Sequence, residues 1–224
     1  MWTKEAVART IDHAILKPFL TDKDVIEACR LGKKHRIACV IVRPTDVPLA
    51  RRELQGSGVK LGVVVGFPYG YNRPEVKALE ARYAIQDGAE EVDMMMNLSK
   101  FLEGDYDHVR KDVKAVVAEA KKCDVVVKVI LEVCYLSADK IMKACEIIRD
   151  AGADFVKTST GFGTGNATAE AVDIMLRAAG FSVKVKAAGG IRNWDDAVKF
   201  LNQGCERLGL GSATATVLEG SARD

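Results

Sequence analysis

The 224-residue chain is 48% hydrophobic and 29% charged, a balance typical of one globular domain, so we expect residues 1–224 to form a single soluble domain. Its 33 basic and 31 acidic residues are mixed along the sequence, and the net charge of +2 predicts no binding to nucleic acid or to a membrane surface. No apolar run approaches the roughly 20 residues of a spanning helix, and the start M-W-T-K-E-A-V-A-R lacks the apolar segment of a signal peptide, which predicts a cytoplasmic protein.

Short apolar runs rich in Val, Ile and Met alternate with longer amphipathic segments. This alternation is typical of βαβ units around a parallel sheet. Eight runs have the character of strands. In chain order they are I-D-H-A-I-L-K near residue 12, I-A-C-V-I-V near 40, K-L-G-V-V-V-G-F near 64, E-V-D-M-M-M-N near 94, V-V-V-K-V-I-L-E near 129, F-V-K-T-S-T near 157, V-K-V-K-A-A-G-G near 187 and R-L-G-L-G-S near 209.

Helical patterns lie between these runs, and several are followed by a glycine that suits a helix C-cap. They include residues 75–86, 106–121, 138–150, 169–179 and 195–203. Eight strand–helix repeats can close into a (β/α)8 barrel or lie open as a doubly wound sheet. The barrel is favoured because the first strand leads into K-P-F-L-T-D rather than the glycine-rich dinucleotide motif. No linker or low-complexity tract suggests a domain boundary.

Cysteine and histidine spacing gives no sign of a metal centre. The six cysteines form no C-x-x-C pair and the three histidines form no H-x-x-x-H pair. In a chain of this size the cysteines are expected to be reduced and mostly structural. The residues therefore predict chemistry without a metal.

Polar residues at the carboxyl ends of the strands are the candidate catalytic groups, because barrel enzymes place their sites there. They are Asp12, Asp93, Asn97, Lys128, Glu132, Lys157 and Lys186. Lysine is depleted in strands and rarely buried unless paired. A single strand lysine is more often one that reaches the rim than a functional one.

The cluster of lysines on neighbouring strands changes this interpretation. Two ammonium groups about 4 Å apart, at an effective dielectric near 20, repel by about 4 kcal/mol, which is equivalent to about three pKa units. Such a shift would give a lysine an appreciable fraction of neutral amine near pH 7, and a neutral amine forms Schiff bases with carbonyls. Side-chain alternation does not choose between Lys184 and Lys186, but Lys186 lies closer to the strand end.

Two glycine-rich turns on consecutive strands predict a phosphate site. They are A-A-G-G-I-R at 187–192 and G-L-G-S-A-T at 209–214. Glycines let backbone N–H groups approach an anion, and Ser212 can add a hydroxyl. Either turn alone is as well explained by a tight connection between strand and helix. Together they favour a phosphate.

The order of these motifs resembles the deoxyribose-phosphate aldolase family, which are class I aldolases with a (β/α)8 fold. The resemblance covers nearly the whole chain, from I-D-H-A-I-L-K-P at 11–18 through G-F-P-Y-G at 66–70, E-V-D-M-M-M-N at 91–97 and K-V-I-L-E at 128–132 to the final G-L-G-S turn. Its most specific parts are D-F-V-K-T-S-T-G at 154–161 and K-A-A-G-G-I-R at 186–192.

The resemblance implies roles for matching residues. Lys157 would form the Schiff base, Lys186 would lower the pKa of Lys157 and help to move protons, and Asp93 would act as acid and base with a water. Thr160 would fix the substrate chain, and the phosphate would be held by Gly189, Gly190, Gly211 and Ser212. The implied reaction is the reversible cleavage of 2-deoxy-D-ribose 5-phosphate to D-glyceraldehyde 3-phosphate and acetaldehyde, without a cofactor. The resemblance also implies that the protein is a homo-oligomer, a dimer or a tetramer.

Some residues depart from the pattern of the family. Arg43 stands where asparagine is common, and it could contact substrate or only pair with an acid. The G-S-A-T turn replaces a run of two serines and a glycine, which would weaken phosphate binding. Two alternatives remain: another Schiff-base aldolase or phosphosugar lyase acting on a keto sugar, and a catalytically inactive phosphate-binding barrel. The presence of Lys157, Lys186 and Asp93 together argues against the second.

Overall fold

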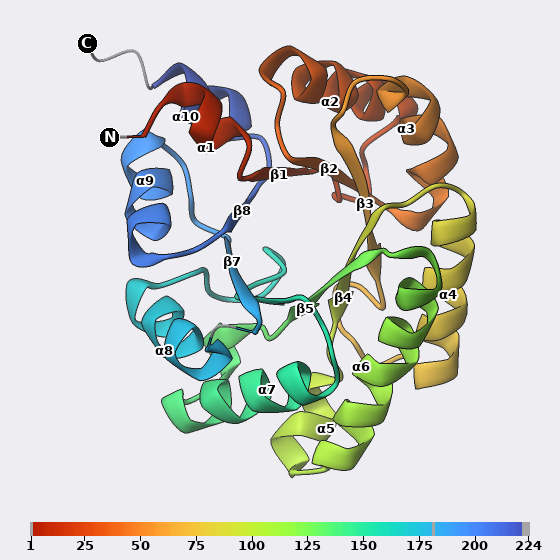
Figure 1. Ribbon diagram of the computed structural model, residues 1–224, viewed down its shortest axis with the longest axis vertical. Helices are drawn as coiled ribbons and strands as arrows, with labels where there is room; N and C mark the ends of the chain where they lie inside the picture. Colours follow the sequence, from red (N-terminus) through yellow and green to blue (C-terminus); the bar gives the residue numbers. More distant parts are fainter. Residues whose placement is uncertain (1, 181, 221–224) are drawn as a thin grey trace.

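The computed structural model describes residues 2–180 and 182–220, and its eight parallel strands close into a barrel in chain order (Figure 1). The predicted (β/α)8 barrel is confirmed, and each strand lies within the run that predicted it. The strands are β1 (Ile11–Ala14), β2 (Cys39–Val42), β3 (Lys60–Val65), β4 (Glu91–Met95), β5 (Val126–Ile130), β6 (Phe155–Lys157), β7 (Lys184–Ala188) and β8 (Arg207–Leu210).

Helices surround the barrel, and the two ends of the described chain lie near each other beside α1 and α10 (Figure 1). The α-helices are α1 (Lys4–Ala8), α2 (Asp22–His35), α3 (Val47–Leu54), α4 (Pro74–Gln86), α5 (Leu98–Glu103), α6 (Tyr106–Ala120), α7 (Ala138–Asp150), α8 (Ala169–Ala179), α9 (Trp194–Gln203) and α10 (Thr214–Glu219). Short 3-10 turns span Pro44–Asp46, Lys121–Cys123 and Val133–Tyr135. The five helical patterns expected from the sequence match α4, α6, α7, α8 and α9 to within one residue at each end.

Alternation along each strand divides the interior into two environments. In β4, Val92 and Met94 belong to the main apolar core, whereas Asp93 between them is fully buried among charged residues. The side chains of Cys39, Ile41 and Val64, from β2 and β3, form a small separate apolar cluster. The charged side chains inside the barrel therefore come from the other strands, β1 and β4–β8.

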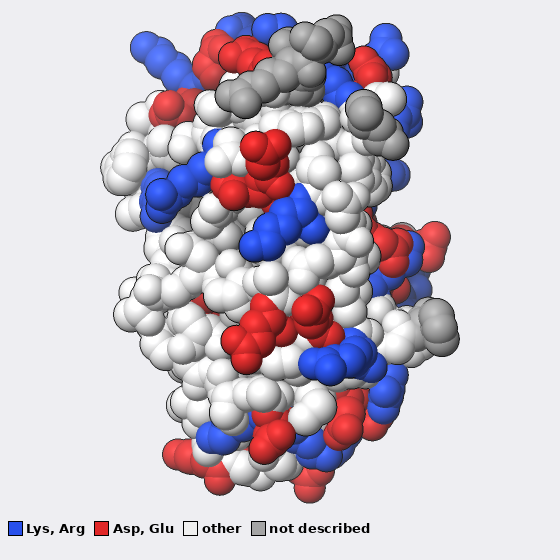
Figure 2. Space-filling view, turned by 90° about the vertical axis from the view of Figure 1, so that its left-hand side faces the viewer, with Lys and Arg blue, Asp and Glu red and all other residues white. Residues whose placement is uncertain are grey.

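Buried sulfur-containing residues behave as core residues. Met94, Met95 and Met96 are at most 1% exposed, as expected for a run that fills a core. All six cysteines lie in the described part of the chain and are free. None of the helices in the described residues combines the length and the apolar character of a membrane-spanning segment. Figure 2 shows basic and acidic side chains interspersed over one face of the molecule.

Candidate functional site

A cavity of about 1060 Å³ opens at the carboxyl ends of β1, β6, β7 and β8. Lys157 and Lys186 both line it. The predicted substrate and phosphate residues also line it, namely Thr160, Gly189, Gly190, Gly211 and Ser212. Asp93 is fully buried and does not line the cavity. The structure thus brings the predicted catalytic and binding residues together at the predicted end of the barrel, with Asp93 beneath the two lysines. Asn97, another candidate, does not line the cavity and instead caps α5 by accepting from Lys100 N.

The two cavity lysines share one carboxylate oxygen. Lys157 Nζ lies 2.7 Å from Asp93 Oδ2, and Lys186 Nζ lies 2.7 Å from the same atom. Strand pairing explains this, because Lys157 and Lys186 are register partners on β6 and β7 and both point inward. Gly209 on β8 leaves room for this arrangement: a Cβ there would lie 3.3 Å from Lys186 Cε and 2.6 Å from Ala188 Cβ.

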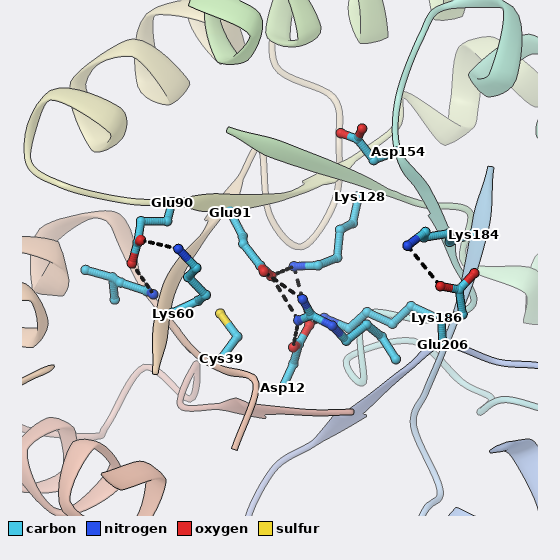
Figure 3. A network of polar contacts seen from close by, with 12 residues as sticks. Asp12, Cys39, Lys60, Glu90, Glu91, Lys128, Asp154, Lys184, Lys186 and Glu206 are labelled. Atoms are coloured by element: carbon cyan, nitrogen blue, oxygen red, sulfur yellow. Dashed lines mark hydrogen bonds and ion pairs between the residues drawn. The ribbon is translucent and has the colours of Figure 1, made fainter. Parts of the chain in front are cut away.

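Further charged groups lie inside the barrel, and Figure 3 shows Asp12, Glu91 and Lys128 pointing toward one another. Lys128 Nζ contacts Glu91 Oε2 at 2.6 Å, Asp93 Oδ1 at 2.8 Å and Asp12 Oδ2 at 3.4 Å. Lys186 also donates a short hydrogen bond to Asp12. Arg207 donates to Asp12, and its guanidinium binds both oxygens of Glu91 at 3.1 and 2.7 Å. We call Asp12, Glu91, Asp93, Lys128, Lys157, Lys186 and Arg207 the barrel network.

Lys157 is the lysine of the barrel network with the fewest acidic partners. It contacts one carboxylate, that of Asp93, whereas Lys186 contacts two and Lys128 contacts three. Burial lowers the pKa of Lys157 to about 8; the Asp93 carboxylate opposes this, and the charges of Lys186 and Lys128 add to it. Because the cationic form is the one that burial disfavours, an appreciable fraction of Lys157 is a neutral amine near neutral pH.

Partners of opposite charge keep Asp93 and Lys128 ionised. Burial would raise the pKa of Asp93, but Lys128, Lys157 and Lys186 outweigh it and hold that pKa well below its usual value. Burial would likewise lower the pKa of Lys128, but Asp12, Asp93 and Glu91 hold it well above its ordinary value. Lys128 does not line the cavity. It is therefore a charged structural partner of Asp93 and not a second candidate nucleophile.

The turn after β7 has the backbone that its glycines predict. Gly189 and Gly190 have φ values of +89° and +80°, which side chains rarely adopt. A Cβ at either position would also crowd Asn166, at 3.0 Å from its Oδ1 for Gly189 and 3.0 Å from its Cβ for Gly190. The turn after β8 holds Gly211 and Ser212, which are both exposed, and leads into the six-residue helix α10.

Thr160 is held by a residue on the neighbouring loop. Its hydroxyl donates a short hydrogen bond to Glu132, and its backbone N–H donates to the other oxygen of that carboxylate at 3.1 Å. The same hydroxyl accepts from Phe162 N at 2.9 Å. Glu132 is buried and has a left-handed φ of +57°. The Thr160 hydroxyl therefore keeps one acceptor position free at most.

Arg43 lies outside the cavity and resolves one of the departures seen in the sequence. Its guanidinium pairs with Asp46 at 2.6 Å and donates to the carbonyl oxygens of Lys17 and Leu20 at 3.2 and 3.0 Å. It therefore fixes the loop between β1 and α2. Lys17 on this loop lines the cavity, with its ammonium 4.1 Å from the centre of the Phe162 ring.

Sequence reasoning missed two members of the barrel network, Glu91 and Arg207. Each lies two residues before an inward-facing position, Asp93 or Gly209, so alternation could have placed it inside the barrel. Asp12, Cys39 and Glu91 also bring potential metal-ligand atoms within 4.8 Å of one another. Both carboxylates already bind Lys128 and Arg207, so a cation there would have to displace two positive side chains.

The fold and this site together are those of a barrel enzyme of the aldolase class. The family model described as DeoC/LacD family aldolase matches residues 6–210. A curated deoxyribose-phosphate aldolase from Clostridium perfringens is 45% identical over 221 residues, covering 99% of this chain and 98% of that protein.

Solved structures agree with this match. A putative deoxyribose-phosphate aldolase from Coccidioides immitis superposes with a TM-score of 0.93 at 40% identity, covering 97% of this chain and 86% of that one. A deoxyribose phosphate aldolase from Aeropyrum pernix, described as a unique tetramer, gives 0.91 at 34% identity, with 97% and 91% covered. The chain belongs to the DeoC/LacD family of aldolases, and the resemblance predicted from its motifs is confirmed.

Proposed function

We propose that this protein is a class I aldolase that reversibly cleaves 2-deoxy-D-ribose 5-phosphate to D-glyceraldehyde 3-phosphate and acetaldehyde. The observation that carries the proposal is the buried Lys157 amine, whose pKa is lowered to about 8 at the wall of an open cavity. A nucleophilic amine beside an acid–base group is what imine formation requires. The relatives named as deoxyribose-phosphate aldolases support the choice of substrate.

In the proposed mechanism the neutral Lys157 amine attacks C1 of the open-chain sugar, and loss of water gives an iminium ion. Removal of the proton from the C3 hydroxyl then breaks the C2–C3 bond. Its electron pair moves into the iminium to form an enamine, and glyceraldehyde 3-phosphate leaves. Protonation of the enamine at C2 and hydrolysis release acetaldehyde and restore Lys157.

Asp93 and Lys186 would move these protons. The Asp93 oxygen that both lysines share lies 2.7 Å from each amine, so a proton can pass between them without rearrangement of the side chains. Asp93 is buried beneath the lysines, so it would reach the substrate through Lys186 or through a water. Lys186 lines the cavity and keeps Asp93 charged.

The phosphate would lie at the two glycine-rich turns. Backbone N–H groups of Gly189, Gly190 and Gly211, with the hydroxyl of Ser212, would surround it. The left-handed backbone at Gly189 and Gly190 favours this role, because it lets consecutive N–H groups face one anion. Thr160 would act mainly by holding the loop after β6, because Glu132 and Phe162 already engage its hydroxyl.

Turnover with defined substrates tests this proposal. The wild-type protein should release acetaldehyde from 2-deoxy-D-ribose 5-phosphate, and in reverse it should accept acetaldehyde as donor in preference to dihydroxyacetone phosphate. Lys157→Leu should be inactive, whereas Lys184→Leu, on the exposed end of β7, should be unaffected. Preference for dihydroxyacetone phosphate would favour an aldolase for keto sugars. Thermal stabilisation by phosphate with no turnover would favour a binding protein.

We also propose that the whole chain is one catalytic domain in a cytoplasmic homo-oligomer, a dimer or a tetramer. The tetramer described for the Aeropyrum pernix relative and the six free cysteines support this. Light scattering on the purified 24.3 kDa chain should give a multiple of its mass. A monomer at micromolar concentration would contradict the proposed assembly.

A further inference from the structure

We propose that Arg207, which does not line the cavity, is a positioning residue that increases the neutral, reactive fraction of Lys157. It would do so by supplying the fourth cation to a buried network that holds three carboxylates. The inference rests on the proposed role of Lys157 as the Schiff-base lysine. It adds a residue on β8 to those that control the reaction.

The contacts of Arg207 connect it to both acids in the lower part of the barrel network. Its guanidinium donates to Asp12 Oδ1 and to both oxygens of Glu91, and its side chain is 17% exposed. Asp12 in turn accepts from Lys186, and Glu91 contacts Lys128 at 2.6 Å. Arg207 therefore competes with these two lysines for the same carboxylates.

The charge count of the barrel network leaves one cation in excess. Its members are three carboxylates (Asp12, Glu91, Asp93) and four basic groups (Lys128, Lys157, Lys186, Arg207). An uncompensated charge in a buried site is costly, and the cheapest relief is loss of one proton. Arginine stays protonated in proteins.

The lysine with the fewest acidic partners is the one expected to lose the proton. Lys128 has three carboxylates and Lys186 has two, whereas Lys157 has only Asp93. If the charge of Arg207 were absent, three lysines would face three carboxylates and no proton would be in excess. Lys157 would then hold its proton more strongly, and the neutral, nucleophilic fraction at neutral pH would fall.

Charged groups from several strands face Lys157 and Arg207. Lys157 on β6 faces Asp93 from β4, Lys186 from β7 and Lys128 from β5. Arg207 faces Asp12 from β1, Glu91 from β4 and the Phe155 ring of β6, whose centre lies 5.9 Å away. Cys39 of β2 is also nearby, and burial raises the pKa of its thiol, so it adds no charge at neutral pH.

Competitive labelling tests the inference without any turnover. The intact protein is treated with trace acetic anhydride across a pH series, and acetylation of the peptide carrying Lys157 is quantified by mass spectrometry. The pH midpoint of this labelling reports the pKa of the Lys157 amine directly. Two unit charges within about 10 Å, at an effective dielectric near 20, shift each other's pKa by about one unit. Arg207 is linked to Lys157 through Asp12, Lys186 and Asp93, so Arg207→Met should raise the midpoint, by up to about one pH unit.

Three further variants separate charge from packing. Glu91→Gln removes a negative charge and should lower the midpoint, the opposite direction from Arg207→Met. Arg207→Lys keeps the positive charge and should leave the labelling midpoint unchanged. Arg177→Met, an exposed arginine on α8, should also leave it in place. Circular dichroism establishes that each variant is folded, and Glu91→Gln keeps the test usable if Arg207→Met does not fold.

Two outcomes would overturn the inference: an unchanged midpoint in Arg207→Met, or shifts in the same direction in Arg207→Met and Glu91→Gln. Labelling does not depend on a substrate, so these outcomes differ from failure of the proposed function, which would appear as absent cleavage by the wild-type protein. If the inference and the proposed function are both correct, the acidic limb of the kcat/KM profile of Arg207→Met should move by the same amount as the labelling midpoint.

Discussion

Lys157 and Lys186 donate to the same oxygen of Asp93, each from 2.7 Å. This arrangement joins a reactive amine to a second cation through one acceptor. The proposed chemistry depends on this pairing, because it keeps Asp93 charged while Lys157 remains easy to deprotonate.

Activity should depend on pH through the Lys157 amine. Its pKa of about 8 means that the neutral amine dominates above pH 8 and the inert ammonium dominates below it. We expect kcat/KM to fall about tenfold per pH unit well below pH 8 and to level off above it. Initial rates at low substrate concentration across pH 5.5–9.5 check this. A flat profile through pH 8 would contradict it.

Lys157→Met should stabilise the protein at neutral pH while it abolishes activity. The pKa of this lysine is about 8 when folded and about 10.4 when unfolded. The unfolded chain therefore binds more protons between these values, and stability rises with pH in that window. Below pH 8 the full cost of burying the protonated Lys157 is present, up to about 3 kcal/mol in the free energy of unfolding. Methionine removes this cost.

Urea unfolding at several pH values measures this effect. The gain in free energy of unfolding should be present at pH 7 and should disappear as the pH approaches 10.5. Lys184→Met is the matched control, because its exposed ion pair with Glu206 should change stability by less than about 1 kcal/mol. A loss of stability in Lys157→Met at pH 7 would be inconsistent with a costly buried cation.

Gly190→Ala should weaken binding of phosphorylated substrate specifically. The left-handed φ of +80° and the 3.0 Å approach to Asn166 Cβ make the alanine both strained and crowded. Gly104→Ala is the matched control, because its φ is +88° and nothing lies within 4 Å of the added Cβ. The KM for 2-deoxyribose 5-phosphate should rise at least about tenfold in the first variant alone, a change equivalent to about 1.4 kcal/mol. Equal effects on unphosphorylated 2-deoxyribose would argue against a phosphate role.

Thr160→Val should loosen the loop after β6, because it leaves Glu132 with one fewer donor and Phe162 N without its acceptor. An unpaired buried polar group costs about 1–3 kcal/mol, so the free energy of unfolding should fall by that amount. Thr160→Ser keeps the hydroxyl and should lose much less. Thermal unfolding and kinetics of the two variants distinguish these cases. Identical behaviour of both would mean that the hydroxyl contacts are unimportant.

The barrel and its site differ in how far the sequence could predict them. Strand runs such as E-V-D-M-M-M-N and the glycines after β7 are local signals, and both predicted the structure well. Lys157 and Lys186 could be chosen because Lys157 ends β6 and Lys186 lies two residues before the end of β7. Glu91 and Arg207 begin their strands, and alternation could have placed them inside the barrel, but it does not indicate which charged groups they pair with.

The electrostatics also needed the structure. Crowding of lysines was expected to lower the pKa of Lys157, but burial is the larger cause and Asp93 opposes it. The position of each carboxylate between its cations depends on strand register, which sequence does not supply. The engagement of Thr160 likewise depends on the left-handed backbone of Glu132, a residue not expected to adopt it.

The most direct measurement is peptide mass spectrometry after incubation with 2-deoxy-D-ribose 5-phosphate and borohydride, which reduces and traps an imine. We expect one reduced adduct on the peptide that carries Lys157, and no adduct in Lys157→Leu. An adduct on Lys186 or Lys128 would contradict the assignment of the nucleophile. No adduct with any carbonyl donor would contradict the Schiff-base mechanism itself.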